Sequence, residues 1–130
     1  MAGTIVADTI QNGTGTSTSM TNAITGSAKA WVQFAGATGT IAGSFNISSV
    51  TRSSAGVYSL SFTTAMPNTN YIATVTPSAD SGTYYMTGMS FSTTGGAASS
   101  PTTSGFAFIT ARTTAVLSDP VIVSVAVFSS

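Results

Sequence analysis

Side chains that could perform acid–base or covalent chemistry are few in this chain. His, Cys and Glu do not occur, so the candidates are Asp8, Asp80, Asp119 and Lys29. Two carboxylates could hydrolyse a glycosidic bond if Asp80 and Asp119 converged at a sugar groove. Both lie in turn-rich segments, however, where Asp commonly hydrogen-bonds the neighbouring backbone. We therefore predict that the chain is not an enzyme and has no catalytic residue.

Metal, cofactor and nucleic-acid sites also lack the residues that they require. The acidic residues are far apart in sequence, which excludes a calcium loop within one segment and leaves open only a site shared on an oligomer axis. No strand-to-helix pattern follows Gly95-Gly96, so this pair does not indicate a phosphate-binding loop. One Lys and two Arg cannot form a basic patch. We predict no metal, no cofactor and no nucleic-acid partner.

The composition favours a surface shared with identical neighbours. Charged residues make up only 5% of the chain and the formal net charge is zero, so Ser and Thr must supply most of the polar surface. Obligate interfaces resemble a protein core and exclude charge, which makes a homo-oligomer the expected state.

The first residues lack the basic and apolar regions of a secretory signal peptide, and no segment approaches the length of a membrane span. We expect no membrane insertion.

Alternating apolar and polar residues predict an all-β domain, and helix signals are scarce. In the first such segment, Ala30, Val32 and Phe34 share one face, whereas Trp31 and Gln33 share the other. The same period predicts further strands over residues 41–47, 58–63, 71–76, 83–91, 106–111 and 121–128.

Two of these strands carry further expectations. The face formed by Ile41, Gly43, Phe45 and Ile47 is expected to pair with segment 58–63 as a hairpin, with a turn over residues 52–56. The last segment is almost continuously apolar, as a central strand covered on both faces would be. Together the short strands predict an antiparallel β-sandwich or a jelly-roll-like domain with an extended N-terminal arm.

The arm is set apart by its composition, with a boundary near Ala28. Residues 28–130 are expected to form the sandwich, and residues 1–27 are too polar for a core of their own. Asn12-Gly13 fits a hairpin turn or a simple loop. We expect the arm to become ordered against a partner, with its apolar residues Ile5, Val6 and Ile10 as candidates for attachment.

A strand over residues 83–91 places large side chains on both of its faces. One sandwich interior cannot hold them all, so one face must meet solvent, a loop or another subunit. The candidates for an oligomer interface are Tyr84, Tyr85, Met86, Met89 and Phe91. The next segment, Thr93 to Ser104, is of low complexity and should be an exposed loop, with Ser99, Ser100, Pro101, Thr102 and Thr103 as candidates for an external contact.

About a third of the chain resembles a known family. The segment from Ala28 to Tyr71 reads AKAWVQFAGATGTIAGSFNISSVTRSSAGVYSLSFTTAMPNTNY and is similar to a domain of tail-fibre and other appendage proteins of phages and prophages. The segment that precedes it, ADTIQNGTGT, also resembles the arm of family members. The family often has an Asn- and Asp-rich turn where this chain has Arg52 to Ala55. Because the turn in this chain has no carboxylate, the resemblance gives little reason to expect a metal there. The resemblance is carried by Ala28, Lys29, Ala30, Trp31, Val32, Phe34, Gly39, Ser44, Phe45, Asn46, Ser49, Thr51, Gly56, Tyr58, Phe62, Ala65, Met66, Pro67 and Tyr71.

The resemblance implies a structural protein on the exterior of a phage particle, synthesised in the host cytoplasm. It favours a homotrimeric fibre or spike whose arm binds tail, portal-neck or capsid proteins and whose sandwich can contact host surface polysaccharide. A capsid decoration or head-fibre protein is the alternative within this class. A carbohydrate-binding module is the alternative from another class, and it predicts a planar aromatic platform on one exposed face. Trp31, Tyr71, Tyr84 and Tyr85 could stack on a sugar, although aromatic residues in strands are more often part of the core.

Overall fold

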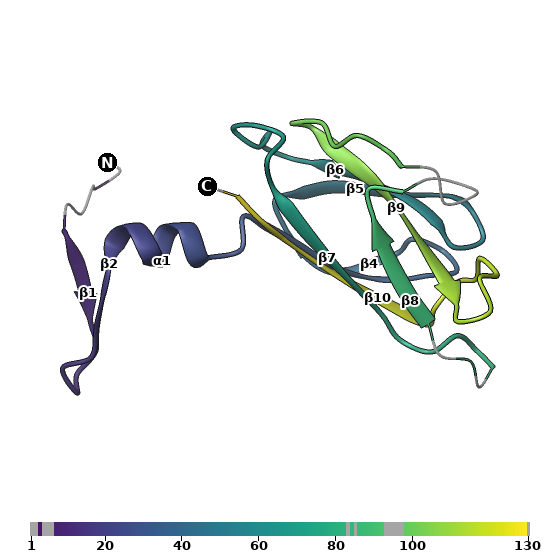
Figure 1. Cartoon of the computed structure of the whole chain (residues 1–130), viewed down its shortest axis with the longest axis horizontal. Coiled ribbons are helices and arrows are strands. Elements are labelled where there is room, and N and C mark those ends of the chain that lie inside the picture. Colours follow the sequence, from purple (N-terminus) through teal and green to yellow (C-terminus); the bar gives the residue numbers. More distant parts are fainter. Residues whose placement is uncertain (1–2, 4–6, 83, 85, 93–97, 130) are drawn as a thin grey trace.

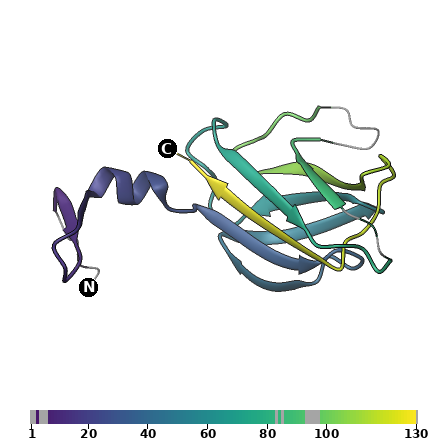
Figure 2. The same ribbon diagram turned by 60° about the horizontal axis from the view of Figure 1, so that its bottom comes forward.

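Two four-stranded antiparallel sheets pack face to face and form most of the molecule (Figures 1 and 2). The structure is a computed structural model of the 130-residue chain and describes residues 3, 7–82, 84, 86–92 and 98–129. Sheet I has the order β4 (Ile41–Phe45), β3 (Ala30–Ala35), β10 (Ile122–Phe128) and β7 (Ile72–Pro77). Sheet II has the order β5 (Ile47–Ser54), β6 (Val57–Phe62), β9 (Gly105–Arg112) and β8 (Met86–Ser90). The expected antiparallel sandwich is confirmed, and its jelly-roll variant is not.

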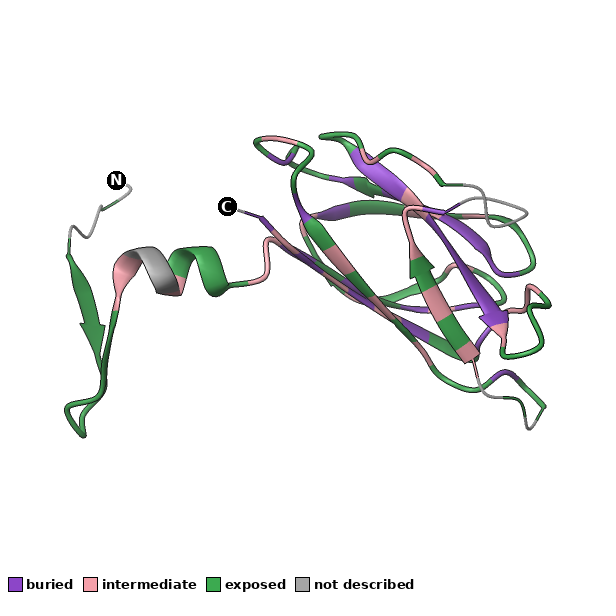
Figure 3. Ribbon diagram, viewed as in Figure 1, coloured by how far each residue is buried: buried purple, intermediate pink, exposed green. Residues whose placement is uncertain are grey.

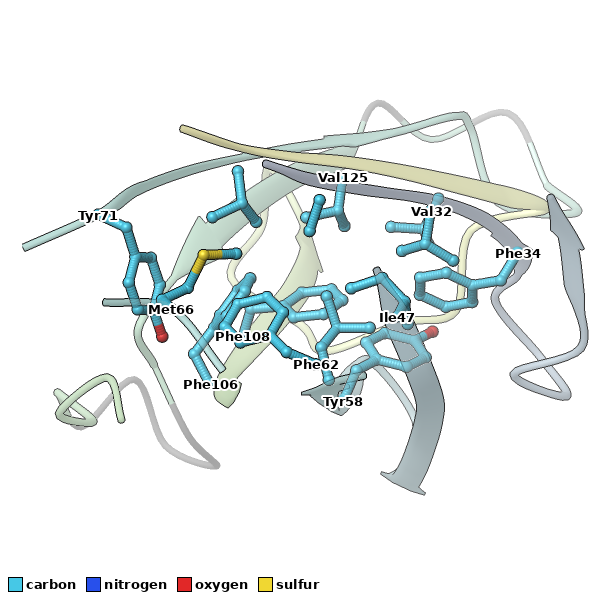
Figure 4. Close-up of a cluster of buried hydrophobic side chains, with 14 residues drawn as sticks. Val32, Phe34, Ile47, Tyr58, Phe62, Met66, Tyr71, Phe106, Phe108 and Val125 are labelled. Carbon is cyan, nitrogen blue, oxygen red and sulfur yellow. The ribbon is translucent and has the colours of Figure 1, made fainter. Parts of the chain in front are cut away.

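Alternation along the strands builds the core between the sheets (Figures 3 and 4). Val32 and Phe34 of β3 point inward, as expected, and meet Tyr58 and Phe108 of sheet II. The ring centroids of Tyr58 and Phe108 lie 5.2 Å apart in a stacked arrangement, and those of Phe34 and Tyr58 lie 5.3 Å apart at a steep angle. Each such buried side chain contributes about 1.5–3 kcal/mol. The interior is therefore rich in aromatic rings and closely packed.

A corner at Asn46 transfers the chain from sheet I to sheet II. Its backbone has a φ of 54°, in the left-handed region that Asn tolerates better than most residues. Its side chain accepts a hydrogen bond from the Thr64 amide at 2.7 Å and donates to the carbonyls of Lys29 and Thr64. The strand expected over residues 41–47 is thus two strands, and the expected common face is wrong. Ile41 and Phe45 are exposed, whereas Ile47 is buried.

The hairpin with β6 is made by β5, and not by segment 41–47 as the sequence predicted. β4 pairs with β3 instead. The expected turn over residues 52–56 is shorter, because β5 continues to Ser54 and only Ala55 and Gly56 turn the chain. Gly56 has a φ of 67°, and a Cβ there would lie 2.3 Å from the carbonyl oxygen of Thr110. This close approach requires glycine.

The last strand, β10, is central but covered on one face only. It pairs with β3 on one side and β7 on the other. Val123, Val125 and Val127 are buried in the core, whereas Ile122 on the opposite face is 44% exposed. The prediction of a strand buried on both faces is therefore wrong. The apolar run in the sequence therefore includes residues of the outer face, such as Ile122, whose side chains meet solvent.

β7 and β8 close one edge of the sandwich across the two sheets. Ser90 donates a hydrogen bond of 2.7 Å to the carbonyl of Ala73. A Cβ at Gly88 would lie 2.5 Å from Cγ1 of Val75, so the strands approach here closer than a larger residue permits. The strand expected over residues 83–91 is shorter in the structure and spans Met86–Ser90.

The N-terminal arm extends away from the sandwich (Figures 1 and 2). β1 (Thr9–Gln11) and β2 (Ser17–Ser19) form a small hairpin, and α1 (Met20–Gly26) leads into β3. The side chain of Asn12 accepts hydrogen bonds from the amides of Thr14 and Thr16, so Asn12-Gly13 belongs to a hairpin turn. The helix was not expected from the sequence. Its carbonyl at Ile24 accepts hydrogen bonds from the side chains of Ser27 and Lys29.

Candidate functional site

Asp80 and Asp119, which the sequence analysis considered for catalysis, lie at the same end of the sandwich. Both border a hollow of about 430 Å³ together with Arg112 and Ser118. The two carboxylates therefore border one hollow. The chemistry of this hollow depends on how each carboxylate is bound.

Asp119 is held by four hydrogen bonds. Arg52 donates two of them, from Nε at 3.0 Å and from Nη2 at 2.7 Å. The amide of Gly56 and the hydroxyl of Tyr58 donate the others, each at 2.8 Å. The carboxylate therefore joins the β5–β6 hairpin to the loop that precedes β10.

Asp80 is held in a similar way and is 5% exposed. Arg112 donates from Nε at 2.7 Å, and the Ser118 hydroxyl donates at 3.1 Å. The amide of Gly82 donates at 3.0 Å, which is the local turn interaction that the sequence suggested for this Asp. The guanidinium carbon of Arg112 also lies 4.1 Å from the centre of the Tyr84 ring.

These contacts keep both carboxylates ionised. Desolvation raises the pKa of Asp119, but the hydrogen bonds from Arg52, Gly56 and Tyr58 outweigh it, and the pKa falls below its usual value. The pKa of Asp80 is lowered in the same way, with burial opposed by Arg112, Gly82 and Ser118. A pair of glycosidase carboxylates needs one member with a raised pKa to protonate the leaving group. Neither Asp80 nor Asp119 has a raised pKa. The geometry of the pair is therefore suited to holding together the strands and turns that donate hydrogen bonds to the two carboxylates.

Among the described residues, no group of three or more His, Cys, Asp or Glu could hold a metal ion. In the same part of the chain, no helix is long and apolar enough to span a membrane.

A second hollow, of about 470 Å³, lies on the outer face of sheet I. Its side chains come from all four strands, and small residues on β4 and β10 leave room between larger ones on β3 and β7. We refer to it as the Trp31 hollow. The residues that line it are Trp31, Val32, Gln33, Ala42, Gly43, Thr74, Thr76, Ser124, Val125 and Ala126.

Trp31 is the main feature of this hollow and is 45% exposed. Alternation predicted that Trp31 lies on the face of the strand opposite to that of Val32, which is correct. We had considered such an aromatic residue more often part of the core. Its six-membered ring lies over Gly43, where a Cβ would be 3.5 Å from Cζ3. Phe45, directly across the β3–β4 ladder, is 55% exposed. The sign that could have identified this surface is the pairing of Trp31 with polar Gln33 on the outer face.

The expected interface residues on and near β8 differ in exposure where the structure describes them. Tyr84 and Met89 are exposed, at 50% and 42%, and Tyr84 is partly covered by Arg112. Met86 is half-buried. Phe91 has a φ of 56° and packs against Tyr71 and Phe106, on the core side. Tyr85 lies outside the described residues.

The low-complexity segment is exposed at its end but firmly bound by its backbone. Side chains of Thr102 and Thr103 are exposed, Ser100 is exposed, and Ser99 and Pro101 are half-buried. The Thr103 carbonyl accepts a hydrogen bond from the amide of Met66, and the Thr102 carbonyl accepts one from the Tyr71 hydroxyl. Residues 93–97 lie outside the described part of the chain.

In the arm, two isoleucines that the structure describes face solvent. Ile10 is 47% exposed and Ile24 is 58% exposed. Ile5 and Val6, the other attachment candidates, lie outside the described residues. Comparison of the chain with protein-family models, with curated proteins and with solved structures gave no match.

Proposed function

We propose that this chain is a structural protein on the exterior of a bacteriophage particle. It forms a homo-oligomeric, trimeric fibre or spike that is attached by its N-terminal arm and projects its sandwich outward toward the host surface. A capsid decoration protein is the alternative position on the particle. The role is not enzymatic, and the two ion-paired carboxylates with lowered pKa values support that part of the proposal.

The observation that carries the proposal is the architecture of the arm. A two-stranded hairpin and a helix of 7 residues lie beside the sandwich instead of packing on its core (Figure 3). Isolated hairpins are marginally stable, and isolated helices shorter than about 12–15 residues are too. Ile10 and Ile24 are exposed on these elements. Such an arm gains stability by packing against other copies or against a particle protein.

The resemblance to phage appendage proteins supports the same role. Several of its residues have structural tasks: Asn46 makes the corner between the sheets, Gly56 turns the β5–β6 hairpin, and Tyr58 binds Asp119. The motif therefore describes how this sandwich is built. The assignment to a virion rests on that shared build together with the arm.

The test uses the full chain in the phage that encodes it. We expect antibodies against the protein to label intact particles in electron microscopy, on a tail for the fibre and on the shell for the decoration protein. The double variant Ile10→Ser and Ile24→Ser should fold normally and be largely missing from purified particles. Val116→Ser is the matched control, because Val116 is 53% exposed in a loop of the sandwich.

Three results would contradict the proposal. The first is absence of the chain from purified particles, and the second is normal incorporation of the arm variant. The third is a monomeric mass for the purified wild-type chain in light scattering, which would remove the oligomer. A dimer would replace the trimer and leave the attachment role in place.

A further inference from the structure

We propose that the Trp31 hollow on sheet I binds a neutral polysaccharide, with one sugar ring stacked on Trp31 and its hydroxyls bonded to Gln33, Thr76 and Ser124. This inference rests on the proposed function, because it gives the projecting sandwich a ligand on the host surface. It differs from the sequence-based expectation, which placed the external contact at residues 99–103.

Trp31 has the position that a stacking platform requires. Because Gly43 has no side chain, the indole lies close over the sheet, with Cζ3 and Cη2 at 3.5 and 3.6 Å from the site of a Cβ. The ring is thereby supported from below while 45% of the residue stays exposed. Aromatic rings in binding sites supply rigid apolar area, which matches the C–H face of a pyranose ring. Phe45 extends the aromatic surface toward the sheet edge.

The polar groups around Trp31 match sugar hydroxyls. Nε2 of Gln33 lies 3.5 Å from the Ser124 hydroxyl oxygen, so the amide is oriented across the floor of the hollow. Thr74 donates to the carbonyl of Ala126 at 3.4 Å, and the Thr76 hydroxyl has no hydrogen-bond partner among the residues that the structure describes. Amides and hydroxyls both donate and accept, as sugar hydroxyls do.

The charge distribution selects a neutral ligand. No side chain that lines the hollow is ionisable. Both Asp–Arg pairs lie instead at the hollow beside Ser118, and the ammonium group of Lys29 is bound to Ser27 and the helix carbonyl of Ile24. An acidic polysaccharide would therefore find no cation in the Trp31 hollow to offset its desolvation.

A second copy of the chain fits this surface less well than a sugar does. Packing another sheet face to face on this one would bury the Thr76 hydroxyl, which has no hydrogen-bond partner among the described residues, and would exclude the water that now solvates Gln33 and Ser124. Each polar group buried without a partner costs about 1–3 kcal/mol. A polysaccharide, by contrast, supplies a hydroxyl for each of them and retains bridging water.

The test exploits the fact that Trp31 is the single tryptophan of the chain. The probes are neutral oligosaccharides of glucose, galactose, mannose and rhamnose, with polygalacturonate as the acidic control. A sugar stacked on Trp31 should shift its fluorescence to the blue and protect it from acrylamide quenching. Interferometry on densely immobilised probes measures the affinity of each variant.

We expect Trp31→Ala to weaken binding of the neutral probe at least about tenfold, with Gln33→Ala also weaker and Trp31→Phe intermediate. Tyr84→Ala is the matched control, because Tyr84 is a similarly exposed aromatic outside the hollow, and it should bind normally. Trp31→Ala should still enter particles, which separates this inference from the role of the arm. If the chain proves absent from particles while binding still depends on Trp31, the proposed function fails and the sugar site stands.

The inference is overturned if none of the neutral probes binds, or if Trp31→Ala binds them like the wild type. It is equally overturned if Trp31→Ala lowers the oligomer mass in light scattering, because the face would then be an interface between copies. Stronger binding of polygalacturonate than of every neutral probe would also refute it.

Discussion

Arg52 binds both carboxylate oxygens of Asp119, at 3.0 and 2.7 Å, across 67 residues of sequence. The same carboxylate accepts a hydrogen bond from the hydroxyl of Tyr58, a residue that is buried in the core. Asp119→Asn keeps the shape but leaves Arg52 without its counter-charge and removes acceptor capacity. We expect a loss of about 2 kcal/mol in the free energy of unfolding, measured by urea denaturation. Asp8→Asn, in the exposed arm, is the control and should be neutral; an equal loss in both variants would contradict the structural role.

The free energy of unfolding should be nearly independent of pH over a wide range. The folded-state pKa values of Asp80 and Asp119 are lowered, so their contribution is present above the unfolded value of 3.8 and is lost as the pH falls further. Burial raises the pKa of Tyr71 from 10.0 to about 12, so its contribution is present below pH 10.0 and is lost as the pH rises toward 12. The chain has no His or Cys side chain to titrate between these limits.

Thermal unfolding at a series of pH values checks this prediction. The melting temperature should stay constant from about pH 5 to about pH 9 and decline on both sides. Asp119→Asn should reduce the acid-side decline. A melting temperature that changes steadily across the neutral range would contradict the prediction.

The sequence predicts the strands better than their pairing. Alternation identifies Val32, Phe34 and Tyr58 as core residues because a strand points successive side chains to opposite faces. It does not say which strands are neighbours. The chain changes sheets at one residue, Asn46, which lies between β4 and β5 in the left-handed region, and no periodicity marks such a corner. This is why the wrong hairpin was expected.

The candidate sites show the same limit. Asp80 and Asp119 each look like ordinary turn residues, and their partners Arg112 and Arg52 are distant in sequence. Only the fold brings the two carboxylates to one end. For Trp31, alternation gives the side of the strand, but its exposure depends on the small residue Gly43 of the neighbouring strand. Long-range packing decides both cases.

Asn46 combines a left-handed backbone with three hydrogen bonds, and two substitutions separate these effects. Asn46→Gly removes the side-chain hydrogen bonds, but glycine adopts the left-handed backbone conformation without strain. Asn46→Ala removes the bonds and also strains the backbone. We expect both variants to be destabilised in urea denaturation, and Ala by about 1 kcal/mol more than Gly. Equal losses would show that the backbone conformation is not constrained.

Gly88 lets β8 approach β7 at the edge of the sandwich. A Cβ there would lie 2.8 Å from the Val75 carbonyl oxygen as well as close to its side chain. Gly88→Ala should therefore lower stability by about 2 kcal/mol through overpacking, measured by thermal unfolding. Gly13→Ala is the control, because nothing lies within 4 Å of its added Cβ. A neutral Gly88→Ala would mean that the edge can open without loss.

Tyr71 fastens the segment before β9 to the core. Its ring is buried, and its hydroxyl lies 2.9 Å from the Thr102 carbonyl and 3.1 Å from the Gly105 carbonyl. Tyr71→Phe keeps the ring contacts and leaves both carbonyls without this donor, so we expect a loss of about 1 kcal/mol in urea denaturation.

The same substitution should increase amide hydrogen exchange at Gly105, whose amide bonds the Thr102 carbonyl within this segment. Tyr84→Phe is the matched control, because Tyr84 is half exposed and its hydroxyl makes no hydrogen bond with the described residues. The control should change neither stability nor exchange. If Tyr71→Phe matches it in both measurements, the segment is held by its own backbone bonds, such as that from Met66 to Thr103, and the Tyr71 hydroxyl contributes nothing.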